Sequence, residues 1–148
     1  MSNKSLENFF INQLDEHISI VEKTKSKIFV SFSNILHICS NAVKSNKKII
    51  FFGNGGSASD AQHLATELTV RYSKNRKAIP AIALTTDTLT LTAIGNDFGF
   101  KYLFSRQIEA LGSKGDVAIG ISTSGKSENV IFGLQQAQYA HVQTIWLP

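Results

Sequence analysis

Beyond residue 47, short apolar runs alternate with amphipathic segments, and this alternation constrains the fold more than any other feature. Four runs have the length and composition of buried strands: residues 47–53 (KKIIFFG), 78–85, 115–122 and 142–147. Helical spacing of apolar residues marks segments 57–72, 100–112 and 125–140, and residues 87–97 fit either a strand or a short helix over 88–94. Strands that alternate with helices predict an α/β fold, with a parallel sheet sandwiched by helices and right-handed crossovers.

Two helices are predicted ahead of the first strand, over residues 6–21 and 28–43, because apolar residues recur there at helical spacing without Gly or Pro. Their apolar faces need a surface to cover, either the core or another subunit. We therefore predict one domain over residues 1–148, with an N-terminal helical part (1–46) and an α/β core (47–148).

Composition excludes several classes of protein. Hydrophobic residues make up 43% of the 148 residues and charged residues 18%, which is typical of a globular domain. The net charge of +4 is spread along the chain, so we expect no nucleic-acid partner. No apolar run is long enough for a membrane span, and the N-terminus has no signal-peptide pattern. Cys39 has no partner for a disulfide, so we expect a buried, unreactive thiol and a reduced, cytoplasmic setting.

Two strand-to-helix turns have the composition of a phosphate site. The glycine turn, residues 53–57 (GNGGS), follows the apolar run of the first strand, and the hydroxyl turn, residues 122–127 (STSGKS), follows the third. Glycines let a ligand approach the backbone, and the N–H groups of a helix's first turn favour an anion. Ser57 is the predicted N-cap of its helix. Capping needs one hydroxyl, whereas the second turn carries four, which favours phosphate binding over simple capping. Neither turn has the spacing of a P-loop.

His63 and Glu67 are four residues apart and share one helix face. Without a function, they form an exposed His–Glu pair or a histidine packed beside the core. With a function, they are two of the three or four ligands that zinc requires, or Glu67 is a general base. Asn96 and Asp97 lie between glycines, so we expect a loop there, whose carboxylate either makes a local turn hydrogen bond or receives a sugar hydroxyl.

Three motifs in order, GNGGSASDAQHLATELTVRY, AIGNDFGF and GISTSGKSENV, together resemble the phosphoheptose isomerase family of the sugar-isomerase (SIS) domain superfamily. The resemblance covers residues 49–148, and the N-terminal helices more loosely. It implies a flavodoxin-like fold, a homotetramer with active sites at subunit interfaces, and one bound zinc ion per subunit. The implied reaction converts sedoheptulose 7-phosphate to D-glycero-D-manno-heptose 7-phosphate, for lipopolysaccharide core or other surface glycans.

The resemblance also implies roles for individual residues. Zinc would be held by His63 and Glu67, and Glu67 would also bind substrate and act as the catalytic acid/base, moving a proton between C1 and C2 through an enediol. Zinc or polar groups would stabilise the oxyanion that develops. Substrate contacts fall on Asn54, Gly55, Gly56, Ser57, Asn96 and Asp97, and phosphate contacts on Ser122, Thr123, Ser124 and Ser127.

The chain departs from the family pattern after the fourth strand. The family continues to a helix whose Gln and His complete the zinc site, and this sequence ends at Pro148 before that segment. We therefore expect an incomplete core, weak zinc binding and little or no isomerase activity. Two alternatives stay open: a non-enzymatic SIS-domain regulator that binds a protein, like the DnaA-initiator-associating protein, and a sugar-phosphate sensor without chemistry.

Overall fold

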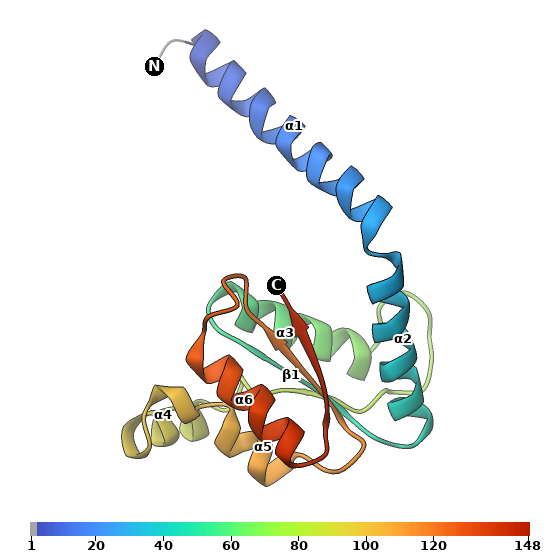
Figure 1. Cartoon of the computed structure of the whole chain (residues 1–148), viewed down its shortest axis with the longest axis vertical. Helices are drawn as coiled ribbons and strands as arrows, with labels where there is room; N and C mark the ends of the chain where they lie inside the picture. Colours follow the sequence, from blue (N-terminus) through green and yellow to red (C-terminus); the bar gives the residue numbers. More distant parts are fainter. Residues whose placement is uncertain (1–2) are drawn as a thin grey trace. The chain divides into compact units, whose positions relative to one another are not determined.

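The computed structural model describes residues 3–148, which form two compact units that divide between His37 and Ile38 (Figure 1). The division falls within the second helix. Each unit is described by itself.

The first unit is helical. Helix α1 covers Asn3–Lys27, and α2 (Phe29–Lys44) begins in this unit and ends in the next. Both confirm the predicted N-terminal helices. Lys25 and Lys27 lie in the last turn of α1, where cations complement the helix dipole. Within residues 3–148, no helix has the length and apolar character that crossing a membrane requires.

The second unit contains a four-stranded parallel sheet, as predicted. Its strands are β1 (Ile49–Gly53), β2 (Ala81–Ala83), β3 (Val117–Ile121) and β4 (Gln143–Leu147), in the order β2-β1-β3-β4. This order is flavodoxin-like, and its switch point lies between β1 and β3. Strand β2 is shorter than predicted. It lies at the edge of the sheet and follows Pro80, which has no N–H to donate and whose carbonyl accepts from the Ile49 N–H.

Helices cover both faces of the sheet. Helix α3 (Gly56–Thr69) packs on β1 and β2, while α5 (Ser105–Leu111) and α6 (Glu128–Tyr139) pack together over the opposite face (Figure 1). The core on the α5–α6 side is built around Phe52 and Phe104, whose ring centroids are 5.2 Å apart. Gly133 makes this packing possible, because a Cβ there would lie 2.8 Å from the Phe52 ring.

Two predicted helices differ from the observed ones. Segment 100–112 divides into a 3-10 helix, η1 (Phe100–Tyr102), and α5, because the chain turns so that both Leu103 and Phe104 are buried. Segment 125–140 is helical only from Glu128. Gly125 has φ +64° and its N–H donates to the Ser122 carbonyl, so the chain forms a turn before α6 begins.

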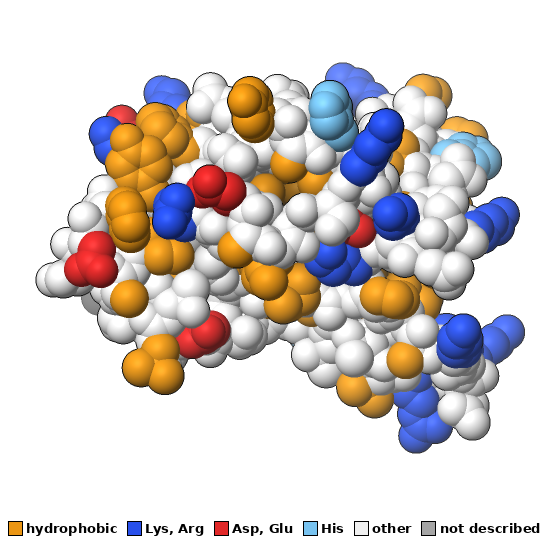
Figure 2. All heavy atoms as spheres, turned by 90° about the horizontal axis from the view of Figure 1, so that it is seen from below, with side chains coloured by type: hydrophobic (Ala, Val, Ile, Leu, Met, Phe, Trp, Pro, Cys, Tyr) orange, Lys and Arg blue, Asp and Glu red, His pale blue; other side chains and the backbone are white. Residues whose placement is uncertain are grey.

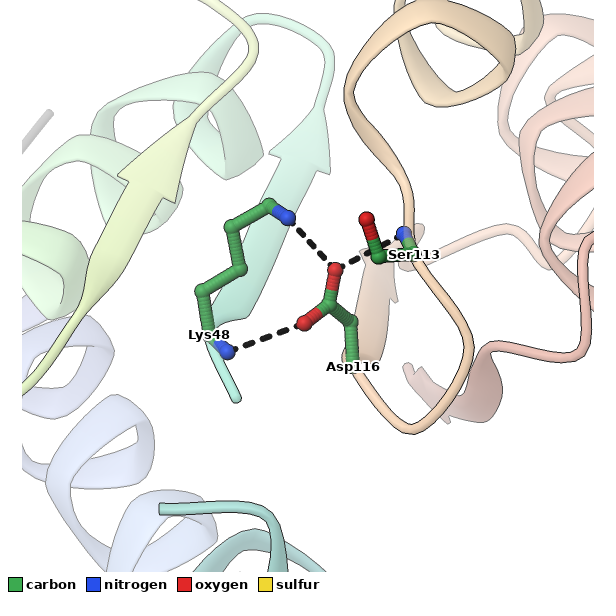
Figure 3. A network of polar contacts seen from close by, with 3 residues as sticks. All are labelled: Lys48, Ser113 and Asp116. Atoms are coloured by element: carbon green, nitrogen blue, oxygen red, sulfur yellow. Dashed lines mark hydrogen bonds and ion pairs between the residues drawn. The ribbon is translucent and has the colours of Figure 1, made fainter. Parts of the chain in front are cut away.

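A buried carboxylate connects two neighbouring strands at the edge of the sheet where the strands begin. Asp116, just before β3, accepts hydrogen bonds from the Lys48 backbone N–H (3.0 Å), the Lys48 Nζ (2.5 Å) and the Ser113 N–H (2.8 Å) (Figure 3). Burial raises the pKa of Asp116, but the hydrogen bonds and the Lys48 charge outweigh this effect and hold its pKa below the usual value. Since Lys48 precedes β1, this group ties β1 to β3.

Candidate functional site

The two turns lie side by side at the carboxyl edge of the sheet. Gly53, the last residue of β1, pairs in register with Ile121, the last residue of β3. The glycine turn and the hydroxyl turn therefore leave adjacent strands at the switch point, where parallel α/β sheets bind ligands. The contact is close, because a Cβ on Gly53 would lie 2.8 Å from the Ile121 carbonyl oxygen.

The hydroxyl turn leaves the start of α6 without a side-chain cap. Ser127 is the N-cap residue, yet its hydroxyl caps no backbone N–H of the helix and instead accepts a 3.1 Å hydrogen bond from the buried Ser122 hydroxyl. Thr123 and Ser124 are exposed beside them. Hydroxyl groups and the first-turn N–H groups of a helix thus face the same region, an arrangement that suits an anion.

The indole of Trp146 supports this turn from β4. Its Nε1 donates to the Ser122 carbonyl at 3.3 Å. Its ring lies where a side chain on Gly125 would extend, because a Cβ on that glycine would stand 3.1 Å from the indole. The Trp146 side chain therefore contacts the hydroxyl turn at both Ser122 and Gly125.

The N-cap of the helix that follows the glycine turn lies two residues earlier than predicted. The N-cap of α3 is Gly55, with φ +54°, and Ser57 lies inside the first turn, so the prediction of Ser57 as N-cap was wrong. A φ of this sign is readily adopted by glycine and rarely by other residues, which is why the helix starts there. Like α6, helix α3 has no side-chain hydrogen bond at its N-cap.

A residue that the sequence did not point to joins the two turns. The Asn129 side chain on α6 and the Asn54 side chain in the glycine turn exchange two hydrogen bonds, Nδ2 to Oδ1 in each direction, both 2.8 Å long. Asn129 is only 3% exposed. Its signal in the sequence was a polar side chain directly before the apolar residues Val130, Ile131 and Phe132, which is weak without the fold.

His63 and Glu67 lie together on α3, with His63 Nε2 3.3 Å from Glu67 Oε1. The His63 side chain is 70% exposed and the Glu67 side chain 31%. His63 also lines an open pocket of about 440 Å³ with Asp60, Leu64 and the ends of β3 and β4. By the 1.5 Å rise of a helix, Glu67 lies about 16 Å along α3 from Gly56. A ligand that reaches both must therefore extend along the helix.

The pair does not form a complete zinc site. Within residues 3–148, no group of three or more His, Cys, Asp or Glu side chains could hold a metal ion. Zinc in proteins takes three or four protein ligands, so two donors alone do not fit it.

The prediction that Asn96 and Asp97 lie in a loop was wrong. Both residues lie in the last turn of α4 (Thr88–Asp97). The helix continues because the Phe98 N–H and the Gly99 N–H both bond to the Ile94 carbonyl. Both side chains are exposed, and the Asn96 amide donates to the Asp97 carboxylate at 2.8 Å. In the described part of this chain, no hydrogen bond joins them to either turn.

Another cavity, of about 520 Å³, lies on the outer side of α5 and α6 and is lined by Phe98, Tyr102, Arg106 and Phe132 among others. Figure 2 shows one face of the molecule, on whose left side hydrophobic side chains lie among both basic and acidic ones. No predicted site residue lines this cavity, so it adds nothing to the site at the switch point.

Comparison with known proteins gives a consistent result. The SIS domain family model matches residues 10–147. The chain is 53% identical over 130 residues to the phosphoheptose isomerase of Paramagnetospirillum magneticum and 50% identical over 135 residues to that of a Nitratiruptor strain. These alignments cover 88% and 91% of this chain, and 68% and 72% of the relatives. The structure of the phosphoheptose isomerase from Neisseria gonorrhoeae superimposes with a TM-score of 0.89 at 39% identity, over 95% of this chain and 73% of that one.

Proposed function

The chain belongs to the SIS domain family and, within it, to the phosphoheptose isomerases, and from this premise we propose that it interconverts sedoheptulose 7-phosphate and D-glycero-D-manno-heptose 7-phosphate. The observation that carries the proposal is the pair of uncapped helix N-termini side by side at the switch point, with the His63–Glu67 pair further along α3. Such a site suits an extended, phosphorylated ligand. In a cytoplasmic setting, the product would supply heptose for surface glycans such as the lipopolysaccharide core.

In the proposed complex, the hydroxyl turn binds the phosphate through Ser122, Thr123, Ser124, Ser127 and the first N–H groups of α6. Asn54, Gly55, Gly56 and Ser57 bind hydroxyl groups of the sugar. Both turns act in binding and orientation, which place the reacting carbons relative to the base.

Proton transfer is assigned to Glu67. Its carboxylate accepts a proton from C1 of the ketose while the C2 carbonyl oxygen takes up a proton, which gives the 1,2-enediol. The carboxylate then returns its proton to C2 while the O1 hydroxyl loses one, which gives the aldose, so that the hydroxyl proton has passed from O1 to O2. A general base of this kind typically contributes about 10²–10⁴-fold in rate. His63, whose Nε2 lies 3.3 Å from Glu67 Oε1, orients that carboxylate.

Zinc remains part of the proposal only in a limited form. His63 and Glu67 supply two donors, so the purified chain is proposed to bind Zn²⁺ weakly and to turn over slowly by itself. Isothermal titration with Zn²⁺ tests this, and Kd values in the nanomolar range would contradict it.

A homotetramer with active sites at subunit interfaces is also proposed. It would account for the exposed Asn96 and Asp97, which another copy of the chain could place beside a substrate, and for the apolar side chains exposed on α1.

The test follows sedoheptulose 7-phosphate in D₂O by proton NMR, because exchange of the C1 proton reports the enediol even when net turnover is slow. Wild type is expected to exchange the proton and form aldose, and Glu67→Gln is expected to lose at least about 10²-fold of this rate. Gln62→Glu, a neighbouring exposed residue of α3, is the control and should change the rate little. Wild type that binds the sugar phosphate but neither exchanges the proton nor forms aldose would exclude the isomerase and favour the sensor.

A further inference from the structure

The amide pair between Asn54 and Asn129 connects the two turns across 75 residues of sequence. Each side chain donates once and accepts once, and both distances are 2.8 Å. We infer that Asn129 is a positioning residue, which fixes the glycine turn relative to the hydroxyl turn so that one ligand can be bound by both. This inference rests on the proposed function, because it takes both turns to bind the same molecule.

The burial of Asn129 requires an explanation. Asn129 is 3% exposed and precedes Val130, which lies in the hydrophobic core. A buried amide is costly unless its polar atoms are hydrogen-bonded, and helix stability alone would favour an apolar residue there. The partner that satisfies this amide is a residue of the proposed ligand site.

The glycine turn is joined to the start of α3 by backbone hydrogen bonds: the Ala58 N–H donates to the Asn54 and Gly55 carbonyls, and the Ser59 N–H donates to the Gly55 carbonyl. Gly55 has φ +54°, and no heavy atom lies within 4 Å of where a Cβ would stand on either Gly55 or Gly56. Two successive glycines without side-chain contacts have wide conformational freedom, and α3 has no side-chain hydrogen bond at its N-cap. The bonds to Asn129 therefore restrict the turn at Asn54, immediately before the glycines.

The consequence depends on the ligand. Inorganic phosphate needs only the hydroxyl turn and the start of α6, whereas a sugar phosphate needs both turns in a fixed relation. Loss of the amide pair should therefore weaken binding of the sugar phosphate more than binding of phosphate, because a mobile turn must be ordered when the ligand binds.

Calorimetric titration of the full chain with sedoheptulose 7-phosphate and with inorganic phosphate tests this difference. For Asn129→Ala, affinity for the sugar phosphate is expected to fall about tenfold and affinity for phosphate less than about twofold. Gln135→Ala, an exposed amide on the same helix, is the matched control and should change neither. Equal weakening of both ligands would make Asn129 a purely structural residue and overturn the inference.

Hydrogen exchange of the ligand-free chain provides an independent arm. The backbone amides of Ala58 and Ser59, which donate to the Asn54 and Gly55 carbonyls of the turn, should exchange about tenfold faster in Asn129→Ala than in wild type or Gln135→Ala. If Asn129→Ala does not fold, Asn54→Ala removes the same pair from its less buried side and should give the same acceleration. Unchanged exchange of these two amides would overturn the inference. Failure of wild type to bind the sugar phosphate would instead refute the proposed function, and the exchange result would still decide the role of Asn129.

Discussion

Ser127 offers the most direct single-residue test of the hydroxyl turn. Its hydroxyl accepts from Ser122, so its own proton can be donated to a phosphate oxygen, and its position is the N-cap of α6. Ser127→Ala is expected to weaken binding of inorganic phosphate about five- to tenfold, because one hydrogen bond to a charged ligand is lost. Calorimetry at low ionic strength measures the effect.

The control for this substitution is Ser113→Ala. Ser113 lies at the amino edge of the sheet and donates its backbone N–H to Asp116, which alanine retains. Its phosphate affinity should equal that of wild type. Equal affinities for Ser127→Ala and wild type would contradict a phosphate site at the hydroxyl turn.

Three elements, β1, α3 and β3, come close together at Gly53. A substitution there tests whether stability depends on this close approach. A Cβ there would lie 2.7 Å from Ser57 Cβ on α3 and 2.8 Å from the Ile121 carbonyl oxygen of β3. Gly53→Ala is expected to lower the free energy of unfolding by about 3 kcal/mol, because the backbone of β3 or α3 would have to move to make room for the added methyl group. Thermal and urea unfolding measure this loss.

Gly56→Ala is the matched control for Gly53→Ala. Gly56 is the first residue of α3, and nothing lies within 4 Å of a Cβ there. Alanine at a helical position with room for it should leave stability unchanged or raise it by up to about 1 kcal/mol. Equal stability of both variants would show that the close approach at Gly53 is unimportant.

Elements differ in how far the sequence could define them. The buried strands and the order of elements were predictable, because apolar runs and helical spacing are local signals. Segment 87–97 was not, since threonines fit either structure, and its helix is decided by Asp87. The Asp87 carboxylate caps α4 through Thr90 N and Thr90 Oγ1, and these hydrogen bonds hold the pKa of Asp87 below its usual value. An Asp three residues before Thr90 was a signal that could have been used.

The site was predictable only in part, for a similar reason. Glycines and hydroxyls after strands identify both turns. By contrast, the placement of Asn96–Asp97 depends on where α4 ends, and the role of Asn129 depends on contact with Asn54, 75 residues earlier. Contacts of that range are set by the sheet order, which no local pattern contains.

For the second unit as a whole, we expect the fall in the free energy of unfolding at acid pH to depend on Asp116. The folded-state pKa is lowered, so the carboxylate contributes stability above its unfolded pKa of about 4, and this contribution is lost as pH falls through the folded pKa. Asp116→Asn should lower the free energy of unfolding at pH 7 by about 2 kcal/mol and flatten its decline below pH 4. Glu109→Gln removes an exposed pair with Arg106 and should cost less than about 0.5 kcal/mol. A parallel decline in Asp116→Asn and wild type below pH 4 would exclude this role.

The last prediction concerns assembly through the first unit. No side chain of α1 is buried, and exposed Leu6, Phe10, Leu14, Ile18 and Val21 recur at helical spacing on one face. Each such side chain gains about 1.5–3 kcal/mol when it is fully buried, so we expect copies of the chain to associate through this face. Light scattering after gel filtration should give a mass near four times the 16.2 kDa of one chain.

The double variant Leu14→Lys, Ile18→Lys should shift the mass to that of one or two copies. The control Asn12→Lys, on the opposite face of α1, should leave the mass unchanged. A single-chain mass for wild type at all concentrations would refute the tetramer and leave the apolar face of α1 to another partner.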